Sequence, residues 1–430
     1  MLKPAIDDCF VSNDRWLTHA AALALLRERI ACRLDVEDTG IEAALGRRLG
    51  VAIAAAAPVP AHTNAAVDGY AFAAGAYDRT TGSSFAVQGR AAAGHPLASV
   101  LAEKSAARIF TGAVMPVGAD TVVMQEDCRR DGDHVHVPSG LRGGANVRRA
   151  GEDVAVGATL FEPGHVVRPQ DLAALASIGL THVPCYRRLR VAVVANGDEV
   201  VATGAGPLLP GQVFDANTPM LQALAALAGA DITNLGIWRD ELATVTRQLR
   251  VAADRFDVVI TSGGASRGEE DHMGAALGAL GTRHFWQLAV KPGRPMMFGQ
   301  IAKSHDPATA PSIVVGLPGN PVAVFVCFLM YVFPLLQRLG GGQWREPRRY
   351  RLPATFSFTG RKRGRREFWR GTLVDTPAGL AVDKFARDGS GLISGLRAAD
   401  GLIDIPEDTG DVAAGDVVDF IPFTEFGIAR

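Results

Sequence analysis

The stretch LRVAVVANG (189–197) decides the fold class of this chain of 430 residues. It is an apolar run that ends in a glycine-containing turn, and FDVVITSGG (256–264) and SIVVGLPGN (312–320) repeat the arrangement. Strands that are apolar throughout are typical of parallel sheets covered on both faces. Helix-like segments alternate with these strands: MLQALAALAGA (220–230), ATVTRQLRVAADR (243–255) and PVAVFVCFLMYVF (321–333). The alternation predicts βαβ units, and hence an α/β domain with a parallel-type sheet.

The rest of the chain is dominated by short β-like runs separated by Gly and Pro. Those between 72 and 137 predict a small β-rich domain, and those after the glycines at 340–342 predict a C-terminal β-barrel or sandwich. Three further helices are expected, over 17–34 with Thr18 as N-cap, over 41–49 and over 169–179.

Composition argues against several classes of function. The net charge is −1, so no global field draws the chain toward nucleic acid or anionic lipid. The five cysteines are scattered without zinc-ligand spacing, which fits a reducing, cytoplasmic compartment without a disulfide framework. The N-terminus carries acids where a signal peptide needs an apolar core. The most apolar segment, 322–333, meets Pro334 before it reaches the ~20 residues of a membrane span, so a buried helix and no membrane are expected.

Three glycine-containing turns follow predicted strands of the α/β domain, at 195–199, 261–271 and 316–321. Loops at the carboxyl ends of parallel strands converge on one cleft. Glycine lets backbone N–H groups approach an anion, and Pro321 would start a helix whose N-terminus adds partial positive charge. Each turn alone is ordinary, but together they predict a site for a phosphate-bearing ligand. None matches the phosphate loops of NAD sites or common ATP sites.

Charged side chains near these turns predict a metal and an oxyanion. Lys291 and Arg294 lie in AVKPGRPMMFG (289–299), where two prolines would hold a cationic loop that suits an oxyanion, unless both are plain surface charges. Carboxylates would repel a phosphate unless a hard cation such as Mg²⁺ lies between them. For two of them, Glu269 and Glu270, the alternative is the acidic first turn of a helix. The full set is Asp198, Glu199, Glu269, Glu270 and Asp271.

In this order, the segments resemble one family, the molybdopterin molybdenumtransferases, which comprises the MoeA proteins and the E-domain of gephyrin. The resemblance covers nearly the whole chain. Its markers are NAAVDGYAF (64–72), IFTGAVMPVGADTVVMQED (109–127), NVRRAGEDV (146–154), NGDEV (196–200), GQVFDAN (211–217), LGIWRDE (235–241), TSGGASRGEEDH (261–272), LAVKPGRPMMFG (288–299) and GLPGNPV (316–322).

The resemblance implies a homodimer of four-domain subunits with an active cleft completed by the partner subunit. Such an enzyme takes adenylated molybdopterin and molybdate, hydrolyses the pyrophosphate with Mg²⁺, releases AMP and leaves molybdenum cofactor. A molybdopterin adenylyltransferase or a molybdoenzyme would be its protein partner. The implied domains are a linking and dimerisation domain (1–60 and 150–186), a β-rich inserted domain (61–149), a molybdopterin-binding α/β domain (187–341) and a C-terminal β-barrel-like domain (342–430).

The resemblance also implies roles for single residues. The catalytic set is Asp153, Glu199, Asp240, Asp271 and Lys291, of which Glu199 and Asp271 would hold the metal. Molybdate would contact Lys291, Arg294, Arg370 and either Ser390 or Ser394. The pterin substrate would contact Gly197, Asp198, Asp215, Asn217, Ser262, Gly263, Gly264, Arg267, Pro318, Gly319, Asn320 and Pro321.

The chain departs from the family pattern at several of these positions. Thr63 stands where an aspartate is usual, and Ala323 stands where a serine would follow GLPGNPV. These losses favour an alternative, a paralogue that binds molybdopterin or finished cofactor as a carrier without inserting metal. A scaffold protein is a third alternative, but the chain lacks the long linker and second pterin domain of such a fusion. The other departures are Ala195 and Asn196 for two hydroxyl residues, Arg267 for a small or apolar residue and His272 for a tyrosine.

Overall fold

The computed structural model describes residues 16–264, 271–306 and 309–429. The chain forms two compact units. The first contains Gly46–Gly50 and Pro184–Arg430 together with the N-terminal residues up to Glu37, and the second contains Asp38–Leu45 and Val51–Val183. The mixed α/β architecture with several sheets confirms the predicted fold class, whereas the finer division into four domains stays a prediction.

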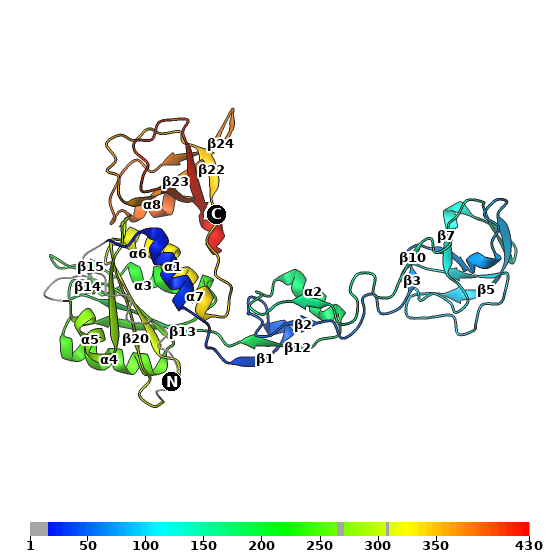
Figure 1. Ribbon diagram of the computed structural model, residues 1–430, viewed down its shortest axis with the longest axis horizontal. Helices are drawn as coiled ribbons and strands as arrows, with labels where there is room; N and C mark the ends of the chain where they lie inside the picture. The colour runs from blue at the N-terminus through cyan, green and yellow to red at the C-terminus, as the bar shows by residue number, and fades with distance from the viewer. Residues whose placement is uncertain (1–15, 265–270, 307–308, 430) are drawn as a thin grey trace. The chain divides into compact units, whose positions relative to one another are not determined.

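A six-stranded sheet forms the centre of the α/β part of the first unit (Figure 1). Its order is β16-β13-β17-β21-β20-β18. The first four strands are parallel, as predicted, and β20 pairs antiparallel with both β21 and β18. The strands span Arg190–Asn196 (β13), Asp231–Trp238 (β16), Val258–Ser262 (β17), Thr282–Gln287 (β18), Pro295–Ile301 (β20) and Ser312–Leu317 (β21).

Helices cover both faces of this sheet because its strands are apolar on both sides. Val191 and Val193 of β13 pack on one face with α1, α3 and α6, while Ala192 and Val194 pack on the other with α4 and α5. Thr18 Oγ1 accepts the Ala21 N–H, which confirms the predicted N-cap of α1. These helices span His19–Arg29 (α1), Asn217–Leu227 (α3), Leu242–Arg255 (α4), His272–Leu280 (α5) and Pro321–Cys327 (α6).

The most apolar helix is longer than predicted. After α6 it continues through a π-helical turn, Phe328–Val332, into α7, Phe333–Leu339. The Phe333 N–H bonds to the Phe328 carbonyl five residues back, and this wider turn lets the helix continue past Pro334. The expectation that the segment stops at Pro334 is therefore wrong. Its 19 residues are long and apolar enough to cross a membrane, but 78% of its most apolar window is buried inside the protein, as expected for a core helix.

A second sheet in the first unit carries the C-terminal part of the chain. Its order is β19-β23-β25-β26-β22, and β24 pairs with β23. The edge strand β19, Val290–Lys291, comes from the region predicted to belong to the α/β domain, and it places Lys291 beside Glu367 of β23. The other elements are β22 (Tyr350–Pro353), β23 (Arg366–Thr376), β24 (Gly379–Lys384), α8 (Ile393–Ala398), β25 (Gly401–Ile405) and β26 (Val417–Pro422).

The second unit is built around a six-stranded sheet of order β7-β4-β6-β5-β9-β8, which agrees with the predicted β-rich region. The helix expected over 41–49 is wrong: only Ile41–Ala43 forms a 3-10 turn, and Gly46 then takes a φ of 73° that breaks the helical path. The sheet strands are β4 (Gly69–Phe72), β5 (Ser83–Ala91), β6 (Ser105–Ile109), β7 (Thr121–Met124), β8 (Arg129–Asp131) and β9 (His134–Val137).

Four two-stranded sheets and the helix α2 complete the sheets and α-helices of the described residues. The helix expected over 169–179 is α2, Pro169–Ser177. The remaining strands are β1 (Val36–Gly40) with β12 (His182–Tyr186), β2 (Ile53–Ala54) with β11 (Thr159–Phe161), β3 (Asn64–Ala65) with β10 (Val147–Arg148), and β14 (Val200–Val201) with β15 (Val213–Phe214).

Candidate active site

The loops at the carboxyl ends of the parallel strands meet, as the sequence predicts. Asn217, at the start of α3, donates from Nδ2 to Ser262 Oγ (2.7 Å) and to the Gly319 carbonyl (2.7 Å). The Gly263 N–H bonds to the Leu317 carbonyl at 3.1 Å. The turns after β17 and β21 are therefore tied together by a buried amide, whose own Oδ1 has no partner among the described residues.

Glycine is required in the turn after β17. Gly263 has a φ of 89°, and a Cβ there would lie 2.4 Å from the Asn196 carbonyl at the end of β13. A side chain at this position would push β13 and β17 apart at their carboxyl ends, so glycine lets the two strand ends lie close together. Asp215, also predicted to contact the pterin substrate, accepts the Thr218 N–H at 3.0 Å and so holds the first turn of α3.

A second group of polar residues, which we call the acidic cluster, gathers at the ends of β13 and β16 and the start of α5. Asp240 Oδ1 accepts from Asn196 Nδ2 at 3.2 Å and lies 3.0 Å from His272 Nδ1. The Asp240 N–H donates to Asp198 Oδ1 at 3.2 Å. Asp271 caps α5 by accepting the Gly274 N–H at 2.8 Å. The cluster consists of Asn196, Asp198, Asp240, Asp271 and His272.

The charge of Asp240 acts on the carboxylate of Asp271. Burial raises the pKa of Asp271, and the charge of Asp240 raises it further, while the Gly274 N–H and Arg283 act in the opposite direction. A cation bound between such groups would relieve their repulsion.

The donor set fits Mg²⁺ as an ion shared with a substrate phosphate. Within the described residues there is no group of three or more His, Cys, Asp or Glu side chains that could cage a metal. Mg²⁺ is usually held by one or two carboxylates and by phosphate oxygens. Asp240 and Asp271 could supply the carboxylates, and the substrate would supply the phosphate oxygens. Glu199, the other predicted metal ligand, is exposed, and its carboxylate lies against Gly197.

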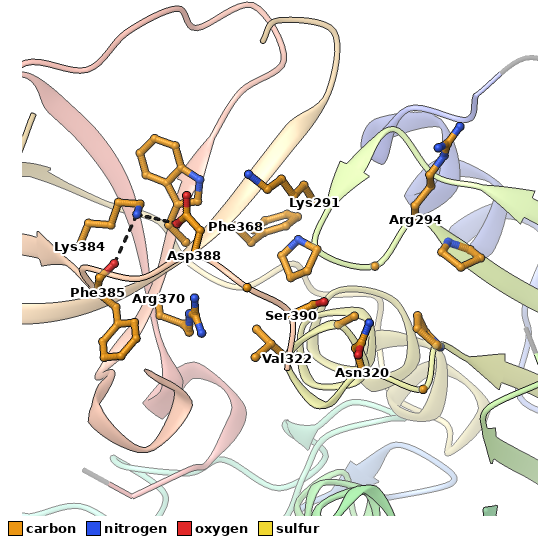
Figure 2. A pocket seen from close by; sticks show the side chains of 18 of the residues that line it. Lys291, Arg294, Asn320, Val322, Phe368, Arg370, Lys384, Phe385, Asp388 and Ser390 are labelled. Atoms are coloured by element: carbon orange, nitrogen blue, oxygen red, sulfur yellow. Dashed lines mark hydrogen bonds and ion pairs between the residues drawn. The ribbon is translucent and has the colours of Figure 1, made fainter. Parts of the chain in front are cut away.

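A cavity of about 580 Å³ opens between the α/β part and the C-terminal sheet of the first unit (Figure 2). Its α/β side is formed by Gly264, by the loop 291–295 and by the start of α6, including Ala323. Among the described residues, four cations and one acid, Asp388, line it. We call it the cationic cavity, and the four cations are Lys291, Arg294, Arg370 and Lys384.

The loop 291–295, which we call the cation loop, is fixed by close packing behind it. Gly293 has a φ of 103°, and a Cβ there would lie 2.2 Å from Cys327 Sγ of α6. The Lys291–Pro292 peptide bond is cis. Cys327 is fully buried, which raises the pKa of its thiol so that it serves as packing beneath the loop.

Ser390 and Arg370 close the cavity from the C-terminal side. The Ser390 carbonyl accepts the Val322 N–H of α6 at 2.9 Å, which joins the loop after β24 to the helix. Arg370 donates to the carbonyls of Leu392 (3.0 Å) and Arg387 (2.8 Å), so it also shapes this loop. Burial lowers the pKa of Arg370, which is 7% exposed.

Most of the residues predicted from the sequence lie at these two places. Pro318, Gly319 and Asn320 line the cavity, and Pro321 takes the first position of α6 as predicted. Ser394 lies in α8 and does not line the cavity, whereas Ser390 does. Asp153 lies in the second unit, and Arg267, Glu269 and Glu270 lie outside the described residues.

Sequence reasoning missed four side chains of the cavity region. Lys384 is paired with Asp388 at 2.7 Å, and Glu367 holds Lys291 at 3.3 Å. Trp369 Nε1 donates to Glu367 at 2.9 Å. None of them forms a motif with the cation loop in the sequence, since strand pairing between β19 and β23 brings them together.

Comparison with known proteins accounts for this arrangement. Family models match residues 17–179 as the MoeA N-terminal region (domains I and II), 192–338 as a probable molybdopterin binding domain and 351–423 as the MoeA C-terminal region (domain IV). A molybdopterin molybdenumtransferase of Haemophilus influenzae is 34% identical over 95% of this chain and 98% of its own length. The chain belongs to the MoeA family.

Other members of the MoeA family agree. Molybdopterin molybdenumtransferase 2 of Mycobacterium tuberculosis is 33% identical over 86% of this chain and 91% of its own length. The crystal structure of a molybdopterin biosynthesis MoeA protein from Pyrococcus horikoshii covers 95% of this chain and 100% of its own, with a TM-score of 0.80 at 26% identity. These matches confirm the predicted family and the prediction that the chain is an enzyme.

The departures from the MoeA pattern fall in different environments. Thr63 Oγ1 accepts the Ala150 N–H at 3.1 Å in the second unit. Ala195 is 2% exposed within β13 and does not line the cavity, whereas Ala323 does. His272 contacts Asp240 in the acidic cluster. Among these departures, Ala323 is therefore the one that removes a hydroxyl from the cationic cavity.

Proposed function

We propose that this chain inserts molybdate into adenylated molybdopterin, with hydrolysis of the pyrophosphate bond and release of AMP, to give molybdenum cofactor. The observation that carries the proposal is the cationic cavity, which four cations of the described residues line together with Gly264 and the turn before α6. A dianion that approaches an already anionic substrate needs such fixed positive charge.

In this proposal the cavity binds molybdate. Lys291 and Arg294 meet the oxyanion from the α/β side, and Arg370 and Ser390 meet it from the C-terminal side. Ser390 and Ser394 were equal candidates on sequence grounds, and the cavity lining favours Ser390. Charge-assisted hydrogen bonds from these groups would hold the oxyanion in place for transfer.

The pterin substrate would lie along the turns after β13, β17 and β21. Gly197, Asp198, Ser262, Gly263 and Asn320 present backbone and polar groups at this edge of the sheet. The Oδ1 of Asn217, which no described residue contacts by a hydrogen bond, is a buried acceptor beside these turns and suits an N–H group of the ligand.

The acidic cluster would serve the hydrolysis. Asp240 and Asp271 would hold Mg²⁺ together with the pyrophosphate, and Glu199 is a further candidate ligand. When bound, Mg²⁺ would neutralise phosphate charge and favour departure of AMP. His272 and Asn196 keep Asp240 in position through their contacts to Oδ1.

Assembly completes the proposal. We propose a homodimer of four-domain subunits in which Asp153, from the second unit, contributes to a cleft. Protein partners would be the enzyme that supplies adenylated molybdopterin and the enzyme that receives the finished cofactor.

The test is AMP release from adenylated molybdopterin, with molybdate and Mg²⁺ each present or omitted. Release that requires both supports insertion. If the pterin binds but no AMP appears in any combination, the chain is a carrier, an alternative that Ala323 favours because it removes a hydroxyl from the cavity.

A further inference from the structure

The four cations of the cationic cavity are not equally committed to partners within the protein. Lys291 pairs with Glu367 at 3.3 Å, and Lys384 pairs with Asp388 at 2.7 Å. Arg370 gives hydrogen bonds to two carbonyls. Arg294 has no ion pair within the described residues, and its one hydrogen bond, to Gln287 Oε1, is long at 3.5 Å.

Arg294 instead lies on an aromatic ring. Its Cζ is 4.0 Å from the centroid of the Trp16 ring. A guanidinium stacked on an indole uses its face and leaves its edge N–H groups free, so the same group can still pair with an oxyanion. Figure 2 shows Lys291 and Arg294 leaving their loop in different directions, so the two cations need separate supports.

The backbone fixes Trp16 in this place. The Leu17 N–H donates to the Gln287 carbonyl at 2.8 Å, and the Ala289 N–H donates to the Leu17 carbonyl at 2.8 Å. Thr18 then caps α1. Trp16 is thus held beside the segment that leads into the loop 291–295, although Leu17 and its bridge partner Leu288 lie far apart in the sequence. 

The indole is not buried as a core residue. Trp16 is 41% exposed, so its packing contributes less to folding than a buried tryptophan would. A large aromatic side chain that stays half-exposed beside a cation of the cavity is better explained by what it does to that cation.

We propose that Trp16 is a positioning residue that holds Arg294 ready to capture the oxyanion. This inference rests on the proposed function, since it takes Arg294 as a molybdate-binding group. Arg294 is the cavity cation that an incoming dianion can engage without first separating it from a carboxylate or from the two carbonyls that hold Arg370, and the stack limits its rotamers before binding.

The experiment is a double-mutant cycle with Trp16→Leu and Arg294→Ala in the full chain. The readouts are the Kd for molybdate by calorimetry and the KM for molybdate and kcat in AMP release. We expect Trp16→Leu to raise Kd and KM about three- to tenfold, the range implied by the strength of an Arg–Trp contact. We expect kcat to stay unchanged, which would show that molybdate binding is weakened while the catalytic step is intact. The Kd and KM of Trp16→Phe, which keeps a smaller ring, should lie between those of the wild type and Trp16→Leu.

The cycle then identifies the route of the effect. In an Arg294→Ala background, Trp16→Leu should change nothing further, since the cation that it positions is gone. Trp344→Phe is the matched control, because Trp344 belongs to the same unit and does not line the cavity. Thermal melting of each variant checks that the fold is intact.

Three results would overturn the proposal. If the wild type binds molybdate and Trp16→Leu binds it with the same Kd, the role of Trp16 is rejected and the proposed function stays in place. An effect of Trp16→Leu that persists in the Arg294→Ala background would show that Trp16 acts by another route. If the wild-type chain showed neither molybdate binding nor molybdate-dependent AMP release, the proposed function and this inference would both fail.

Discussion

The acidic cluster and the cationic cavity are built in different ways. The acidic cluster comes from loops of a single sheet, and three of its members, Asn196, Asp198 and His272, contact Asp240 directly. The cationic cavity is assembled from the α/β part and the C-terminal sheet, which β19 joins by pairing with β23. One site is thus local to one sheet, and the other depends on the joint between two parts of the unit.

The charges in the two places are balanced differently. Asp271 lies within the field of Arg283 and His272, and Asp240 contacts His272 and Asn196. In the cavity, by contrast, both lysines have carboxylate partners. A cation added to the acidic cluster would therefore lower the repulsion between its carboxylates, whereas the cavity can exchange internal partners for an oxyanion.

The largest effect is expected from removing charge in the acidic cluster. Asp271→Asn keeps the N-cap of α5, since asparagine caps as well as aspartate, but it removes the negative charge. If the cluster holds Mg²⁺, AMP release should fall by about 100-fold or more, while the melting temperature changes little. Steady-state AMP release at several Mg²⁺ concentrations measures this.

The matched control is Asp254→Asn. Asp254 also accepts a backbone N–H, from Ser304 at 2.7 Å, but it lies at the far end of α4 and not in the cluster. AMP release in this variant should stay close to that of the wild type. Turnover in Asp271→Asn equal to that of the control would remove Asp271 from the metal site and leave it as a helix cap alone.

A smaller effect is expected from Lys291→Met in the cationic cavity. The loss of one charge-assisted hydrogen bond to an anion amounts to about 1.5–3 kcal/mol, which corresponds to a rise of about 10- to 150-fold in the KM for molybdate. Glu367 keeps Trp369 Nε1 as a partner, so the fold should survive. Binding of adenylated molybdopterin should change less than that of molybdate, because Lys291 is not among its predicted contacts.

Lys362→Met is the control for lost positive charge, since Lys362 is exposed and does not line the cavity. An equal rise in KM in both variants would mean that overall charge, and not the cavity, attracts molybdate. The comparison between the two sites would also break if Lys291→Met weakened binding of the pterin as much as that of molybdate.

The difference between the two sites also explains what the sequence could predict. The apolar runs before Asn196, Ser262 and Leu317 predict parallel strands, and strand order then places their turns on one edge. The family resemblance supplied Arg370 and Ser390, which no spacing argument would have linked to the cation loop. Glu367 and Lys384 were missed because only the pairing of β19 with β23 brings the C-terminal sheet to Lys291.

Both wrong helix predictions have identifiable physical causes. Proline ends most helices, yet Pro334 does not, because the π-turn before it changes the hydrogen-bond spacing. The segment 41–49 has a helical composition, but Gly46 adopts a left-handed φ and Leu49 pairs with Cys185 instead. Both depend on tertiary structure that a local pattern does not contain.

The smallest expected effect tests whether the missing hydroxyl matters. Ala323→Ser would restore a donor to the wall of the cationic cavity, where Ala323 is 3% exposed near the start of α6. One added hydrogen bond is worth about 0.5–1.5 kcal/mol, so the KM for molybdate should fall about two- to tenfold. Ala195→Ser restores a hydroxyl as well, but inside β13, where it cannot reach the cavity, and its KM should not improve.

An improvement in Ala195→Ser that matched Ala323→Ser would show that the cavity wall does not decide molybdate affinity. A gain confined to Ala323→Ser would instead mean that this member of the MoeA family works with a weakened oxyanion site that its remaining cations must support.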